Sequence, residues 1–166
     1  MINLRLILIM LLLVPTTNVF AMGDFQSQGV RSPLINKPSP DLVLTNTEGK
    51  TDPILSSRQG KKAVVIFWAT WCPHCYEELG QLNDNIANIE QKGIKIILVD
   101  IGETTTDVKD YFKRRQMRLI SFVDEDSSVQ EPYHIVGVPT LIFIDEKGMV
   151  RNVTHQFPSD YESYFK

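Results

Sequence analysis

One stretch decides the fold of this 166-residue chain: Phe67-Trp68-Ala69-Thr70-Trp71-Cys72-Pro73-His74-Cys75. The apolar run from Ala63 to Phe67 leads directly into a Cys-x-x-Cys that opens a helical pattern. Pro73 suits the first position of a helix, where its missing N–H would be unpaired anyway, and this places Cys72 at the helix cap. At that cap, free backbone N–H groups and the positive end of the helix dipole stabilise a thiolate. The thiolate is the nucleophile in disulfide exchange, and Cys75 lies one turn later, where it can resolve a mixed disulfide with Cys72.

Two other uses of the cysteine pair fit the sequence less well. A metal half-site would need two more ligands, but the chain has no other cysteine, and its three histidines (His74, His134 and His155) are not in ligand spacing with the pair. A disulfide that closes a two-residue loop removes little entropy from the unfolded chain, so a purely structural bridge is disfavoured. We therefore predict a redox-active pair with no bound metal and no organic cofactor.

The motif resembles that of a known family. Trp71-Cys72-Pro73-His74-Cys75 after an apolar strand is similar to the thioredoxin superfamily, and residues 67–72 resemble its TlpA/ResA-like branch of extracytoplasmic thiol-disulfide oxidoreductases. Three further matches are Ser39-Pro40-Asp41, Val99-Asp100-Ile101-Gly102-Glu103 and Gly137-Val138-Pro139-Thr140. The resemblance extends over residues 36–154 and implies an enzyme that exchanges electrons between cysteine pairs.

The fold implied is an α/β thioredoxin-like fold, a central mixed sheet flanked by helices, over residues 40–166. An N-terminal β-hairpin is predicted from Leu42–Leu44 and Ile54–Leu55, which flank a turn-rich segment. Ile94–Ile101 is an almost continuous apolar run, typical of a strand buried on both faces. A helix that Thr104, Thr105 or Thr106 can cap and a short strand at Leu119–Val123 are predicted to form an inserted helix-strand unit.

Glu78 is the candidate proton carrier. On a helical wheel the apolar positions after the active site share one face, and Glu78 falls among them; these positions are Cys75, Leu79, Leu82, Ile86 and Ile89. Burial would raise the pKa of this carboxyl and allow it to exchange a proton with Cys75 near neutral pH. The resemblance gives a glutamate at this offset the same role, whereas thioredoxin uses a buried aspartate where this chain has Ile66. An exposed carboxylate at the margin of the apolar face is the alternative.

Val138 and Pro139 complete the predicted site. The resemblance implies that Pro139 is cis and faces the cysteines, and that the Val138 backbone is free to pair with an extended client peptide. Trp71, Pro73 and His74 are the other predicted substrate-binding residues. A proline that merely starts the strand Leu141–Ile144 is the alternative.

The first 21 residues have the pattern of a secretory signal: Arg5, the apolar stretch Leu6–Val14 and the small-x-small ending Val19-Phe20-Ala21. Residues 22–39 are predicted to be a flexible lead-in, because they are rich in Pro, Ser, Gln and Gly. The expected location is periplasmic or otherwise extracytoplasmic. An uncleaved membrane anchor at residues 6–22 is the alternative, although the apolar stretch is short for a bilayer.

The expected partners are client proteins with cysteine pairs. The formal net charge of -3 argues against nucleic acid. The chain has no flavin or nicotinamide motif, so a reductase would need an electron donor, and the resemblance suggests a transmembrane protein. A reductant of the cytochrome c maturation type is favoured by the architecture. The Pro73-His74 dipeptide instead resembles DsbA-like oxidants, since His74 can stabilise the Cys72 thiolate. A copper-binding protein that adds His134 or His155 to the two thiolates is a third alternative.

Overall fold

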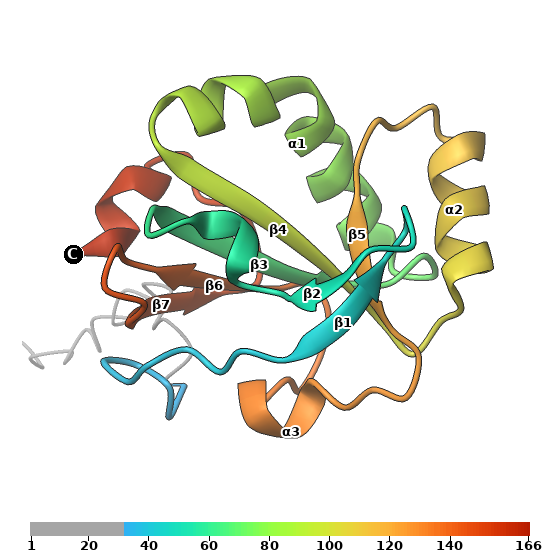
Figure 1. The fold of residues 1–166 in the computed structure, drawn as a ribbon. Helices are drawn as coiled ribbons and strands as arrows, with labels where there is room; N and C mark the ends of the chain where they lie inside the picture. Colours follow the sequence, from blue (N-terminus) through green and yellow to red (C-terminus); the bar gives the residue numbers. More distant parts are fainter. Residues whose placement is uncertain (1–31) are drawn as a thin grey trace, which may run out of the picture.

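The computed structural model describes residues 32–166 (Figure 1). The predicted signal segment and the first part of the predicted lead-in, residues 22–31, lie outside the described residues, so both remain predictions. Within the described residues, none of the helices combines the length and the apolar character needed to cross a membrane.

The described residues form a mixed sheet of seven strands in the order β2-β1-β5-β4-β3-β6-β7. The three central strands β3, β4 and β5 are parallel, and antiparallel neighbours extend the sheet on both sides. The strands are β1 (Val43–Asn46), β2 (Thr51–Pro53), β3 (Lys62–Trp68), β4 (Ile94–Ile101), β5 (Ser121–Asp124), β6 (Thr140–Ile144) and β7 (Val150–Thr154). The runs that form β3 and β4 are almost entirely apolar because both faces of the sheet are covered. The predicted thioredoxin-like architecture is thereby confirmed.

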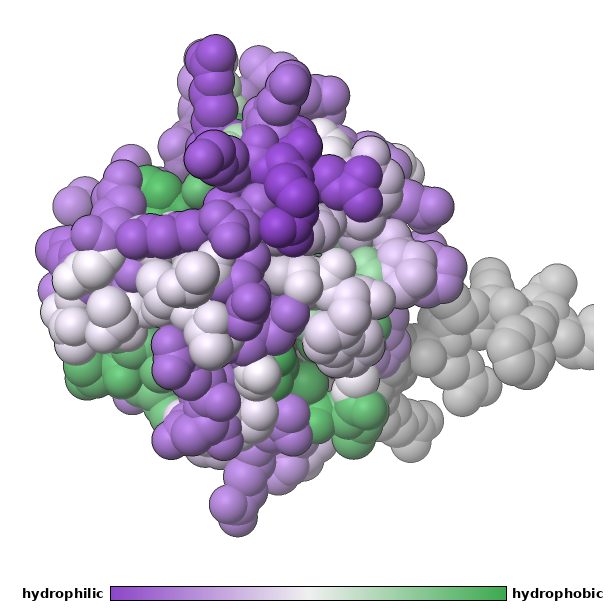
Figure 2. All heavy atoms as spheres, turned by 90° about the vertical axis from the view of Figure 1, so that its right-hand side faces the viewer, coloured by the Kyte–Doolittle hydropathy of each residue, from purple (hydrophilic) through white to green (hydrophobic). Residues whose placement is uncertain are grey.

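Helices cover the two faces of the sheet separately (Figure 1). The long helix α1 (Pro73–Gln91) and the inserted helix α2 (Thr105–Arg114) pack on one face, and the short helix α3 (Gln130–Tyr133) packs on the other. Trp68 marks the centre of the α1/α2 side: its ring lies 5.2 Å from that of Phe112, centroid to centroid. Its indole N–H donates to the Ser121 hydroxyl at 3.0 Å. Figure 2 looks onto the side where α2 lies, and this surface is mainly hydrophilic.

Two boundaries differ from those predicted. The hairpin pairs β1 with β2, and Ile54 and Leu55 follow β2 instead of forming it, because their side chains turn into the core. Residues 22–39 are predicted to be a flexible lead-in, yet within the described part of this range the Asn36 N–H donates to the Val150 carbonyl at 2.8 Å and Leu34 is buried. The packed part of the domain therefore begins before residue 40. The last described element is the short 3-10 helix η2 (Tyr161–Phe165).

Candidate active site

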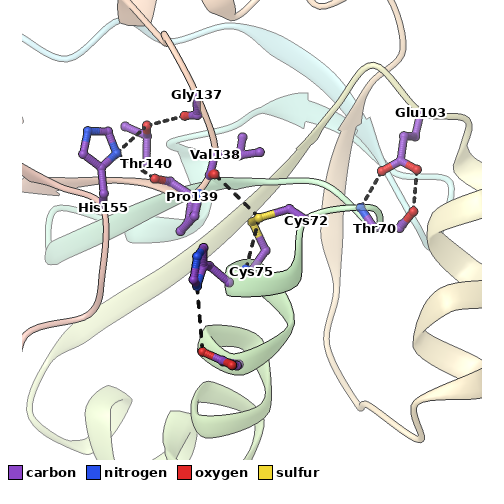
Figure 3. The surroundings of a disulfide bond; sticks show 11 residues. Thr70, Cys72, Cys75, Glu103, Gly137, Val138, Pro139, Thr140 and His155 are labelled. Carbon is purple, nitrogen blue, oxygen red and sulfur yellow. Dashed lines mark hydrogen bonds and ion pairs between the residues drawn. A yellow bond between two sulfur atoms is a disulfide. The ribbon is translucent and has the colours of Figure 1, made fainter.

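Cys72 and Cys75 lie where β3 ends and α1 begins (Figure 3). Cys72 is the N-cap of α1, and its Sγ accepts the Cys75 N–H at 3.1 Å. The two cysteines form a disulfide and are both buried, Cys72 with 5% and Cys75 with 1% of its surface exposed. A sulfur that caps a helix and accepts a backbone N–H is stabilised as a thiolate once the disulfide is reduced. Of the two cysteines, only Cys72 holds the cap position, so its sulfur is the better suited to act as a nucleophile.

A loop from the other side of the sheet reaches the sulfurs (Figure 3). The Val138–Pro139 peptide bond is cis, as the resemblance implied, and the Val138 carbonyl oxygen lies 3.6 Å from the Cys72 Sγ. In the reduced protein the Cys72 thiol can donate a hydrogen bond to this oxygen. The His155 Nδ1 lies 2.8 Å from the Pro139 carbonyl oxygen on the far side of the loop. No sequence signal linked His155 to this loop, because the contact joins the end of β7 to the start of β6.

The residue directly before Cys72 is exposed and borders a hollow. Trp71 has 68% of its surface exposed, and it borders a hollow of about 390 Å³ together with Ile135, Val136 and Val138. Pro73 and His74 are exposed on the first turn of α1. The nearest carboxylate to the His74 ring is that of Glu77, at 4.0 Å. Of the predicted contact residues, Val138 and Pro139 thus lie beside the disulfide (Figure 3). Trp71 shares the hollow with Val138, and the His74 ring lies along the helix near Glu77.

Glu78 lies one turn beyond Cys75 on α1 and is half-buried. Its carboxylate accepts the Phe157 N–H at 2.9 Å and faces a hollow of about 330 Å³ between α1 and residues 157–161. Burial raises the pKa of this carboxyl, the Phe157 N–H partly offsets that rise, and the neighbouring charge of Glu77 adds to it. Residues three apart on a helix are neighbours, so Glu78 and Cys75 lie on the same side of α1.

Two acidic residues that sequence reasoning left without a role also belong to the site. The Glu103 carboxylate accepts the Thr70 backbone N–H at 2.6 Å and the Thr70 hydroxyl at 2.5 Å (Figure 3). Asp100, at the end of β4, is fully buried, and burial together with the neighbouring Glu103 raises its pKa to about 8. The signal for Asp100 was present in the sequence, since it is the one acidic residue in the mostly apolar run Ile94–Ile101. Glu103 gave no such signal.

No group of three or more His, Cys, Asp or Glu side chains within residues 32–166 is arranged to hold a metal ion. His134 is exposed at the end of α3, and the His155 ring faces the Pro139 carbonyl oxygen.

Comparison with known proteins identifies the family. The AhpC/TSA family matches residues 35–153. The chain belongs to the AhpC/TSA family. Thiol-disulfide oxidoreductase ResA of Bacillus thuringiensis subsp. konkukian is 32% identical over 116 residues, which are 70% of this chain but only 66% of that protein. ResA of Bacillus anthracis is 30% identical over 134 residues, 80% of this chain and 77% of that one.

Solved structures give the same fold. The exposed lipoprotein thioredoxin of Streptococcus pneumoniae strain TIGR4 has a TM-score of 0.65 and 25% identity, covering 75% of this chain and 98% of that one. Within the AhpC/TSA family the chain thus groups with thioredoxin-like thiol-disulfide oxidoreductases of the ResA type.

Proposed function

We propose that this protein is an exported thiol-disulfide oxidoreductase that reduces disulfides in client proteins. The observation that carries the proposal is the position of Cys72, which caps α1 and faces the Val138 carbonyl oxygen across the cis-proline loop. The ResA-type relatives support the chemistry, and the signal pattern of residues 1–21 supports the export.

The exchange follows from the two cysteines. In the reduced protein the Cys72 thiolate attacks one sulfur of the client disulfide, forming a mixed disulfide and releasing the other client sulfur as a thiolate. The Cys75 thiolate then attacks the Cys72 Sγ, which releases the second client sulfur as a thiolate and leaves the Cys72–Cys75 disulfide seen here; solvent protonates the released thiolates. Glu78 takes the proton that Cys75 must lose before this attack. Two electrons have then passed to the client, and an external donor, for which a transmembrane protein is proposed, reduces the pair again.

Client binding needs little sequence specificity. An extended peptide that pairs with the Val138 backbone would lie across the Cys72 sulfur by strand addition. The exposed Trp71 and the hollow beside it offer apolar contact for the flanking client side chains. A cytochrome c precursor with a cysteine pair is one client of this kind, as the resemblance suggests.

The surroundings of His74 support reduction over DsbA-like oxidation. The His74 side chain is 83% exposed, and its nearest acidic group is Glu77. Among the described residues no hydrogen bond joins the His74 ring to the Cys72 Sγ. Water screens a charge in this position, so His74 stabilises the Cys72 thiolate less than the dipeptide alone would suggest.

The reduction potential of the pair tests the direction. A value near or below thioredoxin's, about -270 mV, is expected in a glutathione or dithiothreitol redox buffer. A value near about -120 mV would make the protein an oxidant instead. The Cys75→Ser variant should trap clients as mixed disulfides with Cys72, and Cys72→Ser/Cys75→Ser is the matched control that should trap none. Copper retained in stoichiometric amount by the reduced protein after dialysis, without turnover of a protein disulfide, would favour the copper-binding alternative.

A further inference from the structure

Asp100 lies in surroundings that do not suit a charge. It pairs in register with Trp68 on the neighbouring strand β3, and no part of its surface is exposed. Along β4 it alternates with Val99 and Ile101, which belong to the α3 side, so its carboxyl faces the α1/α2 side, as Leu98 does. Neither carboxyl oxygen has a hydrogen-bond partner with good geometry. The Glu103 backbone N–H lies near enough to favour the charged form, but burial outweighs it. A buried carboxylate with so little compensation is costly, so the neutral acid is the form that fits.

The neutral acid has an acceptor at hand. A protonated carboxyl gains one O–H donor, and the carboxyl of Glu103 lies next to Asp100. Two carboxyl groups can form a hydrogen bond only when one of them carries a proton. The missing partners of Asp100 are therefore explained if Asp100 keeps that proton and its O–H donates a hydrogen bond to the Glu103 carboxylate.

The other ionisable groups around the pair do not supply a compensating charge to Asp100. On α2, Asp107 adds repulsion, and the buried Tyr111 hydroxyl, which also has no partner, faces Glu103. The Arg115 guanidinium stacks over the Tyr76 ring of α1, 4.3 Å from its centroid. Burial and the repulsion from Glu103 and Asp107 thus all raise the pKa of Asp100, and only the Glu103 backbone N–H opposes them.

Glu103 connects this pair to the nucleophile. Its two oxygens hold the backbone N–H and the hydroxyl of Thr70, two residues before Cys72 (Figure 3). The Cys72 N–H in turn donates to the Ala69 carbonyl at 3.2 Å, so residues 69–72 form a tight turn. A change in the position or charge of Glu103 therefore alters its hydrogen bonds to Thr70, and with them the turn that positions the Cys72 sulfur.

We propose that Asp100 and Glu103 form an acid–carboxylate pair that shares one proton and positions the turn carrying Cys72. Both are positioning residues, since they act through Thr70. Loss of the shared proton puts two negative charges side by side in a buried place, which displaces Glu103 from Thr70 and changes the reactivity of Cys72. The inference goes beyond the proposed function, because it holds for either direction of electron transfer.

The protonation itself is measured on the oxidised full-length chain, where no thiol titrates. Aspartate labelled with carbon-13 at the carboxyl should give one NMR signal that titrates near pH 8, the value expected for Asp100, and this signal should be missing in Asp100→Asn. Glu103→Gln should move the same signal to lower pH, because it removes the repulsion. If every aspartate signal of the wild type titrates near the ordinary value of about 4, the pair does not exist. That outcome would not count against the proposed oxidoreductase activity, which does not depend on this pair.

The positioning role is measured on the reduced chain by the rate at which iodoacetamide alkylates Cys72 between pH 6 and pH 10. The side-chain amide of the Asp100→Asn variant can donate to Glu103 but cannot lose a proton, so the ratio of wild-type to variant rates should change near pH 8. The matched control is Asp110→Asn, which alters an exposed aspartate of α2 and should leave the ratio flat. A packing role alone would shift the rate by the same factor at every pH, and that result, or no change at all, would overturn the proposal.

Discussion

Replacement of Asp100 by Asn should stabilise the folded protein, which is the opposite of the usual effect of a core substitution. The pKa of Asp100 rises from 3.8 to about 8 on folding, so between these values the folded state binds one more proton than the unfolded state. The free energy of unfolding then falls as the pH rises, by about 1.4 kcal/mol for each pH unit. Neutral pH lies about three units above 3.8. The buried acid therefore lowers the free energy of unfolding by about 4 kcal/mol at pH 7, relative to pH values below 3.8.

Asn has nearly the same shape and keeps a donor toward Glu103, so it removes this cost without opening a cavity. We expect wild type and Asp100→Asn to have similar free energies of unfolding near pH 4 and the variant to be more stable by about 4 kcal/mol at pH 7. Urea unfolding of the oxidised proteins at several pH values measures the difference, and Asp110→Asn serves as the control. A difference that is the same at every pH, or a variant less stable than wild type at pH 7, would refute the argument that Asp100 is buried as a neutral acid.

Three other substitutions test separate parts of the site and its support. Glu78→Gln keeps an acceptor for the Phe157 N–H but cannot carry a proton, so it should flatten the pH dependence of thiol reactivity; an unchanged profile would remove Glu78 as proton carrier. Ser121→Ala leaves the buried Trp68 N–H without a partner and should lower the free energy of unfolding by about 1–3 kcal/mol in urea titrations, while a neutral result would mean that water replaces the hydroxyl. Trp71→Ala removes an exposed ring and should change stability by less than about 0.5 kcal/mol, yet raise KM for a protein disulfide and not for a small one. Equal effects on both substrates would show that Trp71 does not contact clients.

The parts of the structure that the sequence predicted are those set by neighbours along the chain. The cysteine pair, the proline after Cys72 and the apolar run before them are consecutive, and helix capping acts over a single turn. The central strands were recognisable because strands covered on both faces form nearly continuous apolar runs. Helical periodicity alone placed Glu78 beside the apolar face of α1, where the structure shows it half-buried.

The parts that escaped prediction depend on residues far apart in the sequence. Residues 34–39 have a loop-like composition, and only the presence of β7, more than a hundred residues later, provides the carbonyl that orders Asn36. The contact between Glu103 and Thr70 spans 33 residues. Asp100 could be recognised as an unusual residue in a buried strand, but the identity of its partner required the positions of β4 and the loop before α2.

The position of Asp100 follows from the way this sheet is built. Strands β3 and β4 are parallel, so their carboxyl ends lie at the same edge, and the residues after each strand meet there. Cys72 follows β3 and Glu103 follows β4. The parallel arrangement of these strands therefore brings the two residues close together, although they are far apart in the sequence. A buried acid at the end of β4 lowers the free energy of unfolding at neutral pH, because its pKa is raised on folding. An apolar residue in this place would avoid that loss. Departures from such local rules are expected where a protein holds chemistry, and here the departure lies directly behind the active-site turn.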